Sequence, residues 1–296
     1  MASTPVSVSG AAALPLPPAR TADSNKGTYG RVLIVAGSRG MSGAAALAGL
    51  GALRGGAGLV ELATPIGVQA IVAAIETSWL TTGLPEDSEG RLSAEASKTL
   101  ANRFESASAV AIGSGWGLSE GTRTLAAKLV AECPCPMVVD ADALNALADL
   151  PDVWRKAVAP RIITPHPGEF ARLLKTTVSD VQTDRSGKAK AFAETHSLVV
   201  VLKGTGSVIT DGTRLVVNST GNPGMATGGT GDVLTGLIAA LLAQKMEPFE
   251  AAQLGVYLHG LAGDLAAAHM SQPGLIASDL PRYLGRAWMV LEDQRR

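Results

Sequence analysis

The sequence predicts an α/β protein of three layers, with a mostly parallel central sheet that has an antiparallel edge and helices on both faces. Short runs rich in Val and Ile alternate with longer segments of helical periodicity along most of the 296 residues, as in a chain of βαβ units. Apolar residues make up 46% of the chain but aromatic residues only 4%, so Ala, Val, Leu and Ile must form most of the core. The turn Asp211-Gly212 between two short apolar runs predicts a hairpin, which supplies the antiparallel edge.

The first βαβ unit illustrates how each strand and helix is predicted from the sequence. The β-branched run 31–36 predicts a buried strand, and the segment 44–55 places leucines three residues apart, as on one side of a helix. A second strand is expected at 58–63, and Pro65 suits the first turn of the helix after it. By the same criteria we expect further strands at 108–113, 137–142, from Arg161, and at 198–204, 205–210 and 213–218, and further helices at 93–104, 119–132, 143–148, after His166, from about Asp232 to Ala243, at 248–270 and at 277–291.

Charge and cysteine content narrow the classes of function. The formal net charge is −1, without a long basic or acidic run, which argues against binding to nucleic acid or to a membrane surface through bulk charge. No uninterrupted apolar segment reaches the ~18–20 residues of a membrane span. Cys133 and Cys135 have no His or Cys partner at zinc-binding spacing, so we interpret them as ordinary thiols in a reducing compartment, the cytoplasm.

The chain is expected to divide into a short leader and one large domain. Residues 1–25 are rich in Ala, Pro and Ser, and Pro15, Pro17 and Pro18 interrupt the apolar run that a secretory signal needs. We therefore predict a flexible leader at 1–25 and a single α/β domain at 26–296, without an internal repeat or a low-complexity linker.

The most informative stretch runs from Asn222 to Ala243 and changes from a glycine-rich loop to an apolar helix at Gly228-Gly-Thr-Gly-Asp232. Glycines let the backbone approach a ligand, and the first N–H groups of a helix lack intrahelical partners, so this junction suits an anion such as a phosphate. Asp232 has two interpretations, which this stretch alone leaves open: a base that takes a proton from a hydroxyl, or a residue that caps the helix. The chain contains no Walker A motif and no G-x-S-x-G elbow.

Other loops that follow predicted strands contain candidate ligand-binding residues. Gly113-Ser-Gly-Trp-Gly117 predicts a close backbone approach to a ligand at the carboxyl end of a strand. Asp140 and Asp142 end the next strand; we favour capping of the following helix, with contact to a nucleotide's metal or polar groups as the alternative. His166 stands between two prolines, where a rigid loop can present it to a ligand, and Lys203 ends the most hydrophobic strand.

Together these blocks resemble the ADP/ATP-dependent NAD(P)H-hydrate dehydratases of the ribokinase-like superfamily. G-G-T-G-D before an apolar helix is similar to the anion-hole and base motif of that superfamily. The blocks extend over residues 26–285, and the combination of T-P-H-P-G-E with G-G-T-G-D is highly specific for the family. The further matching blocks are Lys26-Gly-x-Tyr-Gly-Arg31 with Ala36-Gly-Ser38 and Ser42-Gly-Ala-Ala45, Ile112-Gly-Ser-Gly115, Ile163-Thr-Pro-His-Pro-Gly-Glu169 and Val201-Leu-Lys-Gly204.

The resemblance implies a role for each matching residue. Asp232 matches the residue that contacts the substrate and acts as the base, and Gly229, Thr230 and Gly231 match the anion hole. Ser114, which precedes Gly115, departs from the family, where proline is common at this position. The hydrate site is matched by Ala44, Gly115, His166 and Asp232, and the adenine nucleotide site by Lys203, Gly204, Thr205, Gly206, Ser207 and Gly231.

The resemblance also implies the reaction. Members of the family repair hydrated NADH and NADPH: an adenine nucleotide phosphorylates the C6 hydroxyl of the S-epimer, and phosphate then leaves with electron push from the ring nitrogen. ADP, which gives AMP, is the expected donor, with ATP as the alternative. Mg²⁺ is the usual metal, although this sequence offers no dedicated carboxylate cage for it. We expect a separate epimerase as functional partner, because the leader is too short for the epimerase domain of many relatives, and a homo-oligomer, of which a tetramer is one form.

Two other functions remain open at this point. A ribokinase-like kinase for hydroxyethylthiazole, a pyridoxine or a sugar would share the fold and Asp232 and would differ in the acceptor pocket, where the block 164–169 favours the dehydratase. A nucleotide-binding regulator without catalysis belongs to another class. It would have no need for both Asp232 and the complete glycine loop.

Overall fold

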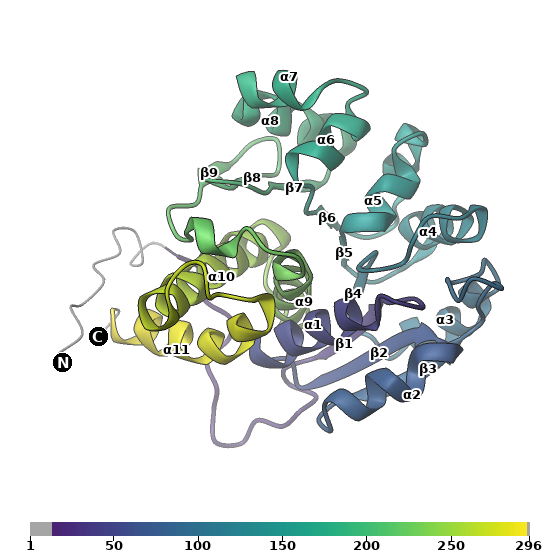
Figure 1. Cartoon of the computed structure of the whole chain (residues 1–296), viewed down its shortest axis with the longest axis horizontal. Helices are drawn as coiled ribbons and strands as arrows, with labels where there is room; N and C mark the ends of the chain where they lie inside the picture. The colour runs from purple at the N-terminus through teal and green to yellow at the C-terminus, as the bar shows by residue number, and fades with distance from the viewer. Residues whose placement is uncertain (1–13, 295–296) are drawn as a thin grey trace.

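A nine-stranded sheet forms the centre of the computed structural model, which describes residues 14–294 (Figure 1). In spatial order the strands are β3 (Leu80–Leu84), β2 (Leu59–Pro65), β1 (Arg31–Val35), β4 (Ala109–Ile112), β5 (Met137–Val139), β6 (Arg161–Ile163), β7 (Val199–Leu202), β8 (Val208–Thr210) and β9 (Leu215–Val217). All neighbouring pairs from β3 to β7 are parallel. The last two pairs are antiparallel. The predicted fold class, including its antiparallel edge, is confirmed.

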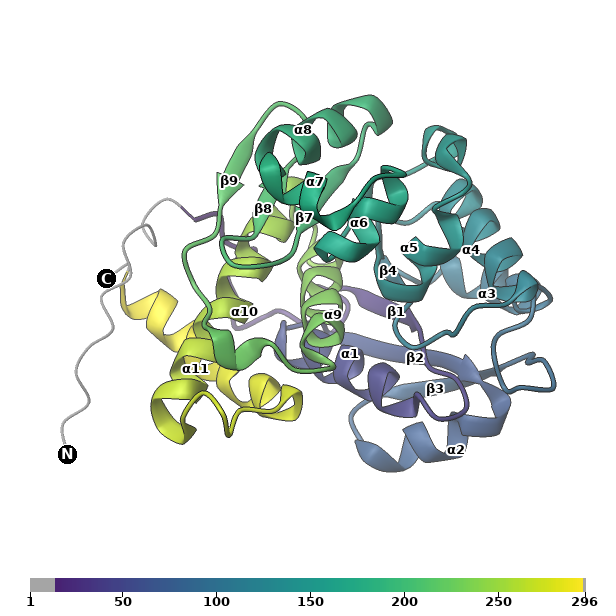
Figure 2. The ribbon, with the colours of Figure 1, turned by 45° about the horizontal axis from the view of Figure 1, so that its top comes forward.

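Different helices cover the two faces of the sheet (Figure 2). One face carries α1 (Ser42–Arg54), α2 (Ile66–Ile75), α9 (Thr230–Ala243), α10 (Pro248–Met270) and α11 (Leu280–Asp293), and the other carries α3 (Ala96–Phe104), α4 (Glu120–Glu132), α5 (Ala141–Leu147), α6 (Pro167–Leu173), α7 (Val178–Thr183) and α8 (Arg185–His196). Alternate residues of β1 show the division, since Val32 and Ile34 face the first set and Leu33 and Val35 the second. Because both faces are covered, β4 to β7 are buried along their whole length.

Helices α1 and α9 pack against each other backbone to backbone. A Cβ on Gly236 would lie 1.8 Å from the carbonyl oxygen of Ala48, and one on Gly51 would lie 2.2 Å from that of Val233. Only glycine permits this approach. The contact fixes the start of α9, which carries the predicted anion-binding motif, against Leu47 of α1, one turn after Ala44.

We expect Gly236→Ala to destabilise the protein by about 3 kcal/mol, because the added methyl group must push the two helix backbones apart. Gly285→Ala in α11 is the matched control, since a Cβ there meets nothing within 4 Å. The control should gain about 0.5–1 kcal/mol, as expected for alanine in an open helix position. Urea unfolding of both variants measures the difference, and equal stabilities would show that the α1–α9 contact is not as tight as described.

The structure contains elements that the sequence does not predict and moves several boundaries. Strand β3 reads Leu-Thr-Thr-Gly-Leu and lacks the β-branched apolar run used to predict the other strands. Helices α7 and α8 are polar and contribute few buried residues, so their apolar periodicity is weak. The strand expected at 137–142 ends at Val139, and Pro65 closes β2, so α2 begins one residue later than predicted.

The described part of the predicted leader lies against the body of the protein. Residues 1–13 lie outside the described residues, and residues 14–25 form no helix or strand. Leu14 is nevertheless buried. The Arg20 guanidinium donates a hydrogen bond of 2.7 Å to the Gly56 carbonyl oxygen and lies 3.9 Å from the centre of the Tyr29 ring. The division into leader and domain stays a prediction.

Two further expectations concern the thiols and the membrane. Cys133 and Cys135 are buried free thiols. Between residues 14 and 294 there is no helix with the length and apolar character that crossing a bilayer requires.

Candidate active site

The predicted site residues gather where the loops after β1, β4, β5, β6 and β7 meet the start of α9. A Cβ on Gly231 would lie 3.3 Å from Lys203 Nζ and 3.7 Å from Asp140 Oδ2. A Cβ on Gly115 would lie 2.7 Å from the Cβ of Ala44. Residues that are far apart in the sequence therefore converge at the carboxyl ends of the strands, where open α/β sheets bind ligands.

The start of α9 has the backbone geometry of an anion site. Gly229 is the N-cap residue, with a left-handed φ of 95°, and a Cβ on it would lie 2.5 Å from Leu47 Cδ1. Thr230 Oγ1 donates to the carbonyl oxygens of Met225 and Thr227, both at 3.2 Å. The hydroxyl is thus turned to the preceding loop. The Asp232 amide donates to the Gly229 carbonyl oxygen at 3.1 Å, so the amides of Thr230 and Gly231 are the ones placed to bind an anion.

Two residues of α10 hold the loop that leads into this turn. Asp264 accepts hydrogen bonds of 2.9 Å from the Gly221 amide and from Asn222 Nδ2. His259 Nε2 lies 2.9 Å from the carbonyl oxygen of Thr230. Burial lowers the pKa of His259 to about 4, so the neutral ring donates its Nε2 proton to that carbonyl at pH 7.

Asp232 lies in the first turn of α9 but does not cap it. Gly229 is the N-cap, and no side-chain cap hydrogen bond is present, so the capping interpretation of Asp232 is wrong. Burial, followed by the nearby Asp140 carboxylate, raises the pKa of Asp232 to about 7, although Ser114 and Lys203 oppose the rise. A carboxylate with this pKa can take a proton from a hydroxyl at neutral pH.

Lys203 is the centre of a polar cluster behind the anion site. Its Nζ lies 2.7 Å from Asp140 Oδ1 and 3.9 Å from Glu169 Oε2. Burial lowers the pKa of Lys203, but the two carboxylates more than offset this, so the net shift is upward and the ammonium group stays charged. Burial also raises the pKa of Glu169 to about 7.

The two carboxylates after β5 bind partners outside their own helix. Asp140 accepts from Lys203 and, through Oδ2, from Thr235 Oγ1 at 2.8 Å. Asp142 accepts from the Gly117 amide at 2.8 Å. No side-chain cap hydrogen bond is present at the start of α5. The capping interpretation favoured from the sequence is therefore wrong for both residues, and Asp140 instead connects β5, β7 and α9.

His166 caps α6 and still presents its ring to solvent. Its Nδ1 accepts from the Gly168 amide at 2.9 Å, and its own amide donates to Glu169 Oε2 at 2.7 Å. Burial, and then the charges of Lys203 and Arg172, lower the pKa of His166. The neutral ring is 51% exposed, so it remains accessible to a ligand while its Nδ1 fixes the loop.

Loops after β1 and β4 form the side of the site that contains Ala44 and Gly115. Ser38 Oγ donates to the Gly115 carbonyl oxygen at 2.8 Å, and the Gly37 amide donates to the Ser114 carbonyl oxygen at 2.8 Å. Gly115 has a φ of +64°, and the close Ala44 methyl group leaves no room for a side chain there. The two loops therefore form one rigid wall.

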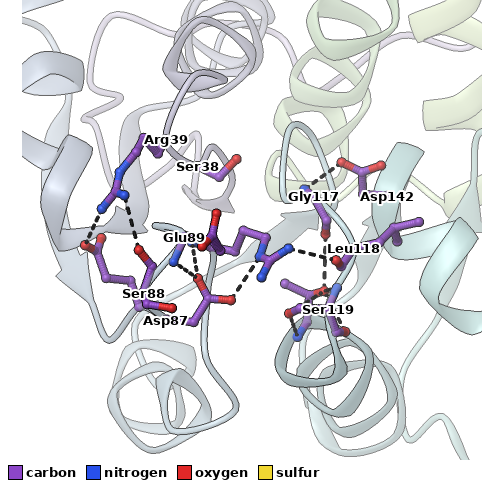
Figure 3. Close-up of polar contacts among 12 residues, drawn as sticks. Ser38, Arg39, Asp87, Ser88, Glu89, Gly117, Leu118, Ser119 and Asp142 are labelled. Atoms are coloured by element: carbon purple, nitrogen blue, oxygen red, sulfur yellow. Dashed lines mark hydrogen bonds and ion pairs between the residues drawn. The ribbon is translucent and has the colours of Figure 1, made fainter.

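A loop between β3 and α3 braces this wall from outside, as Figure 3 shows. Gly90 accepts a hydrogen bond of 3.0 Å from the Arg39 amide, and Arg91 donates to the Leu118 carbonyl oxygen at 3.2 Å. The exposed side chains of Met41 and Leu118 lie on the braced loops. They give this side of the site an apolar surface, of the kind that packs against planar rings.

The segment 203–207 forms an exposed turn beside the cluster. Arg185 of α8 donates to the carbonyl oxygens of Leu202 and Lys203 at 3.0 and 3.2 Å. Ser207 Oγ donates to the Gly204 carbonyl oxygen at 3.1 Å. Gly204 and Thr205 are exposed, so this turn is open to a nucleotide, whereas the Lys203 side chain points inward to Asp140.

The described residues offer few side chains that could bind Mg²⁺ directly. Residues 14–294 contain no group of three or more His, Cys, Asp or Glu side chains placed to hold a metal ion. Asp140 and Glu169 lie beside the anion site, but both already bind Lys203. This arrangement fits Mg²⁺ that arrives with a nucleotide and keeps phosphate oxygens and waters as ligands.

A cavity of about 290 Å³ lies elsewhere, at the amino-terminal end of β6. Trp154, Arg161 and His196 are among its lining residues. Arg161 is buried and donates to the carbonyl oxygens of Val130 and Cys133 at 2.8 and 2.7 Å. This cavity is at the opposite end of the strands from Asp232 and plays no part in the site.

The sequence indicates some of these residues but not their partners. Glu169 belongs to the T-P-H-P-G-E block, yet its approach to Lys203 depends on β6 and β7 being neighbours. Thr235, Asp264 and His259 carry no motif. Asp264 and His259 could have been found because they are polar residues within the apolar helix α10. Such residues need hydrogen-bond partners when they are buried.

The fold and the site together define a ribokinase-like protein. The chain aligns in three dimensions with ribokinase of Thermotoga maritima at a TM-score of 0.53 and 15% identity, covering 86% of this chain and 99% of the other, a likeness that concerns the fold alone. With the ADP/ATP-dependent NAD(P)H-hydrate dehydratase of Bacillus subtilis, crystallised with ATP and Mg²⁺, the TM-score is 0.79 at 34% identity, covering 93% and 94% of the two chains.

Comparison of sequences gives the family. The model of the NAD(P)H-hydrate dehydratase family matches residues 32–286. The ADP-dependent (S)-NAD(P)H-hydrate dehydratase of Bacillus subtilis is 37% identical over 279 residues, which cover 93% of this chain and 95% of that protein. The chain therefore belongs to the NAD(P)H-hydrate dehydratase family, as the sequence predicts. It is also 47% identical to the bifunctional NAD(P)H-hydrate repair enzyme Nnr of Moorella thermoacetica, over 94% of this chain but only 52% of that protein.

Proposed function

We propose that this chain dehydrates the S-epimer of hydrated NADH and NADPH, with ADP as phosphoryl donor, and so repairs nicotinamide nucleotides. The observation that carries the proposal is the Asp232 carboxylate, with a pKa near 7, in the first turn of α9 beside Lys203. A phosphate-binding helix start next to a base is what phosphorylation of a hydroxyl requires. The name of the Bacillus subtilis relative supports ADP; ATP is the alternative donor.

In the first step Asp232 takes the proton of the C6 hydroxyl while the hydroxyl oxygen attacks the β-phosphorus of ADP, and AMP leaves. The amides of Gly229, Thr230 and Gly231 hold the transferring phosphoryl group. The Lys203 ammonium group offsets the negative charge beside it. Mg²⁺, when bound with the nucleotide, adds further neutralisation of phosphate charge.

In the second step the C6–O bond breaks and phosphate leaves with the bonding electrons. The lone pair of the ring nitrogen stabilises the cation, and loss of a proton from C5 to the departing phosphate restores the double bond of NAD(P)H. Ala44 and Gly115 line the hydrate ring on one side and His166 on another, while Gly204, Thr205, Gly206 and Ser207 receive the adenine nucleotide. These roles rest on the resemblance and on the convergence of the loops at Asp232.

The direct test is recovery of NADH absorbance in the near ultraviolet when the protein is incubated with hydrated NADH, Mg²⁺ and ADP, with ATP in a parallel reaction. We expect recovery with ADP and stoichiometric AMP. No recovery with either nucleotide, together with phosphorylation of hydroxyethylthiazole, pyridoxine or a sugar, would replace this proposal by the kinase alternative.

Complete repair requires the other epimer to be converted as well, because water can add to either face of the ring. We therefore propose that a separate epimerase acts together with this enzyme. An equal mixture of the two hydrate epimers should be consumed only to about half by the purified chain, and fully after an epimerase is added. Full consumption without it would contradict the proposed stereospecificity.

A further inference from the structure

The cavity at the amino-terminal ends of β6 and β7 lies outside the candidate active site. Its lining residues come from the 3₁₀ helix Pro151–Lys156 and the segment after it, from the start of β6 and from the end of α8. Two arginines and a histidine are among them, but no Asp or Glu. The volume of about 290 Å³ equals that of roughly ten water molecules in the liquid. The cavity therefore has room for a small polar molecule and a cationic lining.

Arg161 brings to this cavity a positive charge that lacks a counter-ion. It is only 2% exposed, and its N–H groups donate to backbone carbonyl oxygens such as those of Val130 and Cys133. These carbonyls satisfy the hydrogen bonds of the guanidinium group but carry no unit charge. Burial lowers the pKa of Arg161, and no carboxylate of residues 14–294 opposes the fall, whereas two carboxylates more than offset burial at Lys203. A buried cation without a counter-ion favours an anion beside it.

His196 offers a hydrogen-bond donor to the same cavity. Its ring lies against Phe192, with 4.3 Å between the ring centres, and is partly exposed. Nδ1 is buried and has no hydrogen-bond partner in the described part of the chain, so Nε2 is the nitrogen that a ligand can reach. A proton on Nδ1 would be a buried donor without an acceptor, and the neutral ring therefore carries its proton on Nε2. Burial, and then the charge of Arg155, lower the pKa of His196, although Asp152 opposes the fall. The ring is thus neutral at pH 7, with its Nε2–H available to an oxygen atom.

Arg155 adds a second positive charge to the lining. Its side chain is exposed and makes no hydrogen bond or ion pair with another described residue. The hydroxyl groups of Thr195 and Ser197, which also line the cavity, likewise have no protein partner within residues 14–294. Guanidinium, imidazole N–H and hydroxyl groups are donors that suit the oxygens of a phosphate group. Three kinds of unused donor therefore line one cavity, beside the buried charge of Arg161.

We propose that this cavity binds a small anion with a phosphate group, in contact with Arg155 and His196 and beside the buried charge of Arg161. The anion is inorganic phosphate or the phosphate monoester of a small alcohol, since both present the same oxygens to these donors. The site is independent of the proposed function, because the cavity lies at the opposite end of the strands from Asp232.

The test is the rate at which diethyl pyrocarbonate modifies each histidine of the full chain, measured by peptide mass spectrometry. The reagent attacks an accessible nitrogen of a neutral ring, so a ligand in the cavity should protect His196. Inorganic phosphate and glycerol 3-phosphate should each slow modification of His196 in a saturable way, whereas glycerol should not. His269 is exposed near the end of α10 and is the internal control, whose rate should stay constant. His166 reports separately on anions bound at the active site.

The two phosphate compounds distinguish the sources of the anion. Protection by glycerol 3-phosphate at a lower concentration than by inorganic phosphate would identify a monoester as the ligand, because its organic part then gains contacts in the cavity. Protection at an equal or higher concentration would identify the free ion. Either result supports the site.

Arg155→Gln and Lys156→Gln form a matched pair of variants. Lys156 is the exposed neighbour of Arg155 but does not line the cavity. Arg155→Gln should raise the phosphate concentration that half-protects His196 about tenfold, the scale of one charge-assisted hydrogen bond, and Lys156→Gln should leave it nearly unchanged. Thermal unfolding should show both variants folded, since both side chains are exposed. Modification of His196 that neither phosphate compound slows, or an equal effect of the two substitutions, would overturn the proposal.

Discussion

Asp232→Asn is expected to lower kcat for dehydration by about 10³–10⁴-fold, the scale of a lost general base. The amide has nearly the shape of the carboxylate but cannot accept the hydroxyl proton. The Gly229–Gly231 backbone is unchanged by this substitution, so the affinity for ADP should stay within a few-fold. Single-turnover assays with hydrated NADH and titration calorimetry with ADP measure the two effects. Asp149→Asn, at a side chain that is 70% exposed, is the control and should be fully active.

The pH dependence follows from the pKa of Asp232, which is raised to about 7. The base must be ionised, so kcat/KM should rise with pH and level off above about pH 7. Glu169 also has a pKa of about 7, and the two must be separated. If the rise of kcat/KM with pH reports the ionisation of Asp232, the Glu169→Gln variant should retain that rise. If the rise of kcat/KM with pH disappears in Glu169→Gln, the rise reports the ionisation of Glu169 and not that of Asp232.

Asp232→Asn should also stabilise the protein at neutral and alkaline pH. Between an unfolded pKa of 3.8 and a folded pKa of about 7, the folded protein keeps a proton that the unfolded chain has lost, so stability falls as pH rises through this window. Above about pH 7 the ionised, partly buried Asp232 lowers stability by up to about 4 kcal/mol, at ~1.4 kcal/mol per pKa unit. Asp232→Asn removes this cost. Its melting temperature should exceed that of the unaltered protein at about pH 8 and approach it at about pH 4.

The sequence predicts the fold well where local pattern and tertiary structure agree. The helix expected at 248–270 has the bounds of α10, because its apolar positions keep helical spacing throughout. β3 escapes prediction because its place is set by pairing with β2 rather than by its own residues. Helices α7 and α8 escape because they bury only a few side chains.

The site is predictable as a set of motifs but not as a network. Gly228–Asp232 is visible because glycines and a helix start require a special local backbone. The partner of Asp140 is not visible, because Lys203 lies 63 residues away. Their contact depends on β5 and β7 both flanking β6. A carboxylate before a helix resembles a cap in the sequence, and only the sheet order shows that this one binds a lysine.

Asp140→Asn is expected to have the second largest effect, through both stability and the pKa of Asp232. Asp140 is 2% exposed and lies 2.7 Å from Lys203 Nζ. Breaking a buried ion pair by removing one partner costs about 3–5 kcal/mol, and the Glu169 carboxylate that remains near Lys203 should keep the loss toward the lower value. Asp140→Leu with Lys203→Met, which removes both charges, should be more stable than Asp140→Asn alone.

The catalytic consequence of Asp140→Asn has a definite direction. The Asp140 carboxylate raises the pKa of Asp232 while Lys203 lowers it. Without the negative charge, and with Lys203 freed to approach Asp232, the pKa of Asp232 should fall. The rise of kcat/KM with pH should then move to lower pH, although the maximum rate decreases because the cluster behind the anion site is disturbed. Thr235→Val is the control: it removes the hydroxyl that donates to Asp140 but keeps both charges, so its pH profile should stay near that of the unaltered enzyme. An unshifted profile in Asp140→Asn would show that Asp140 does not set the proton affinity of the base.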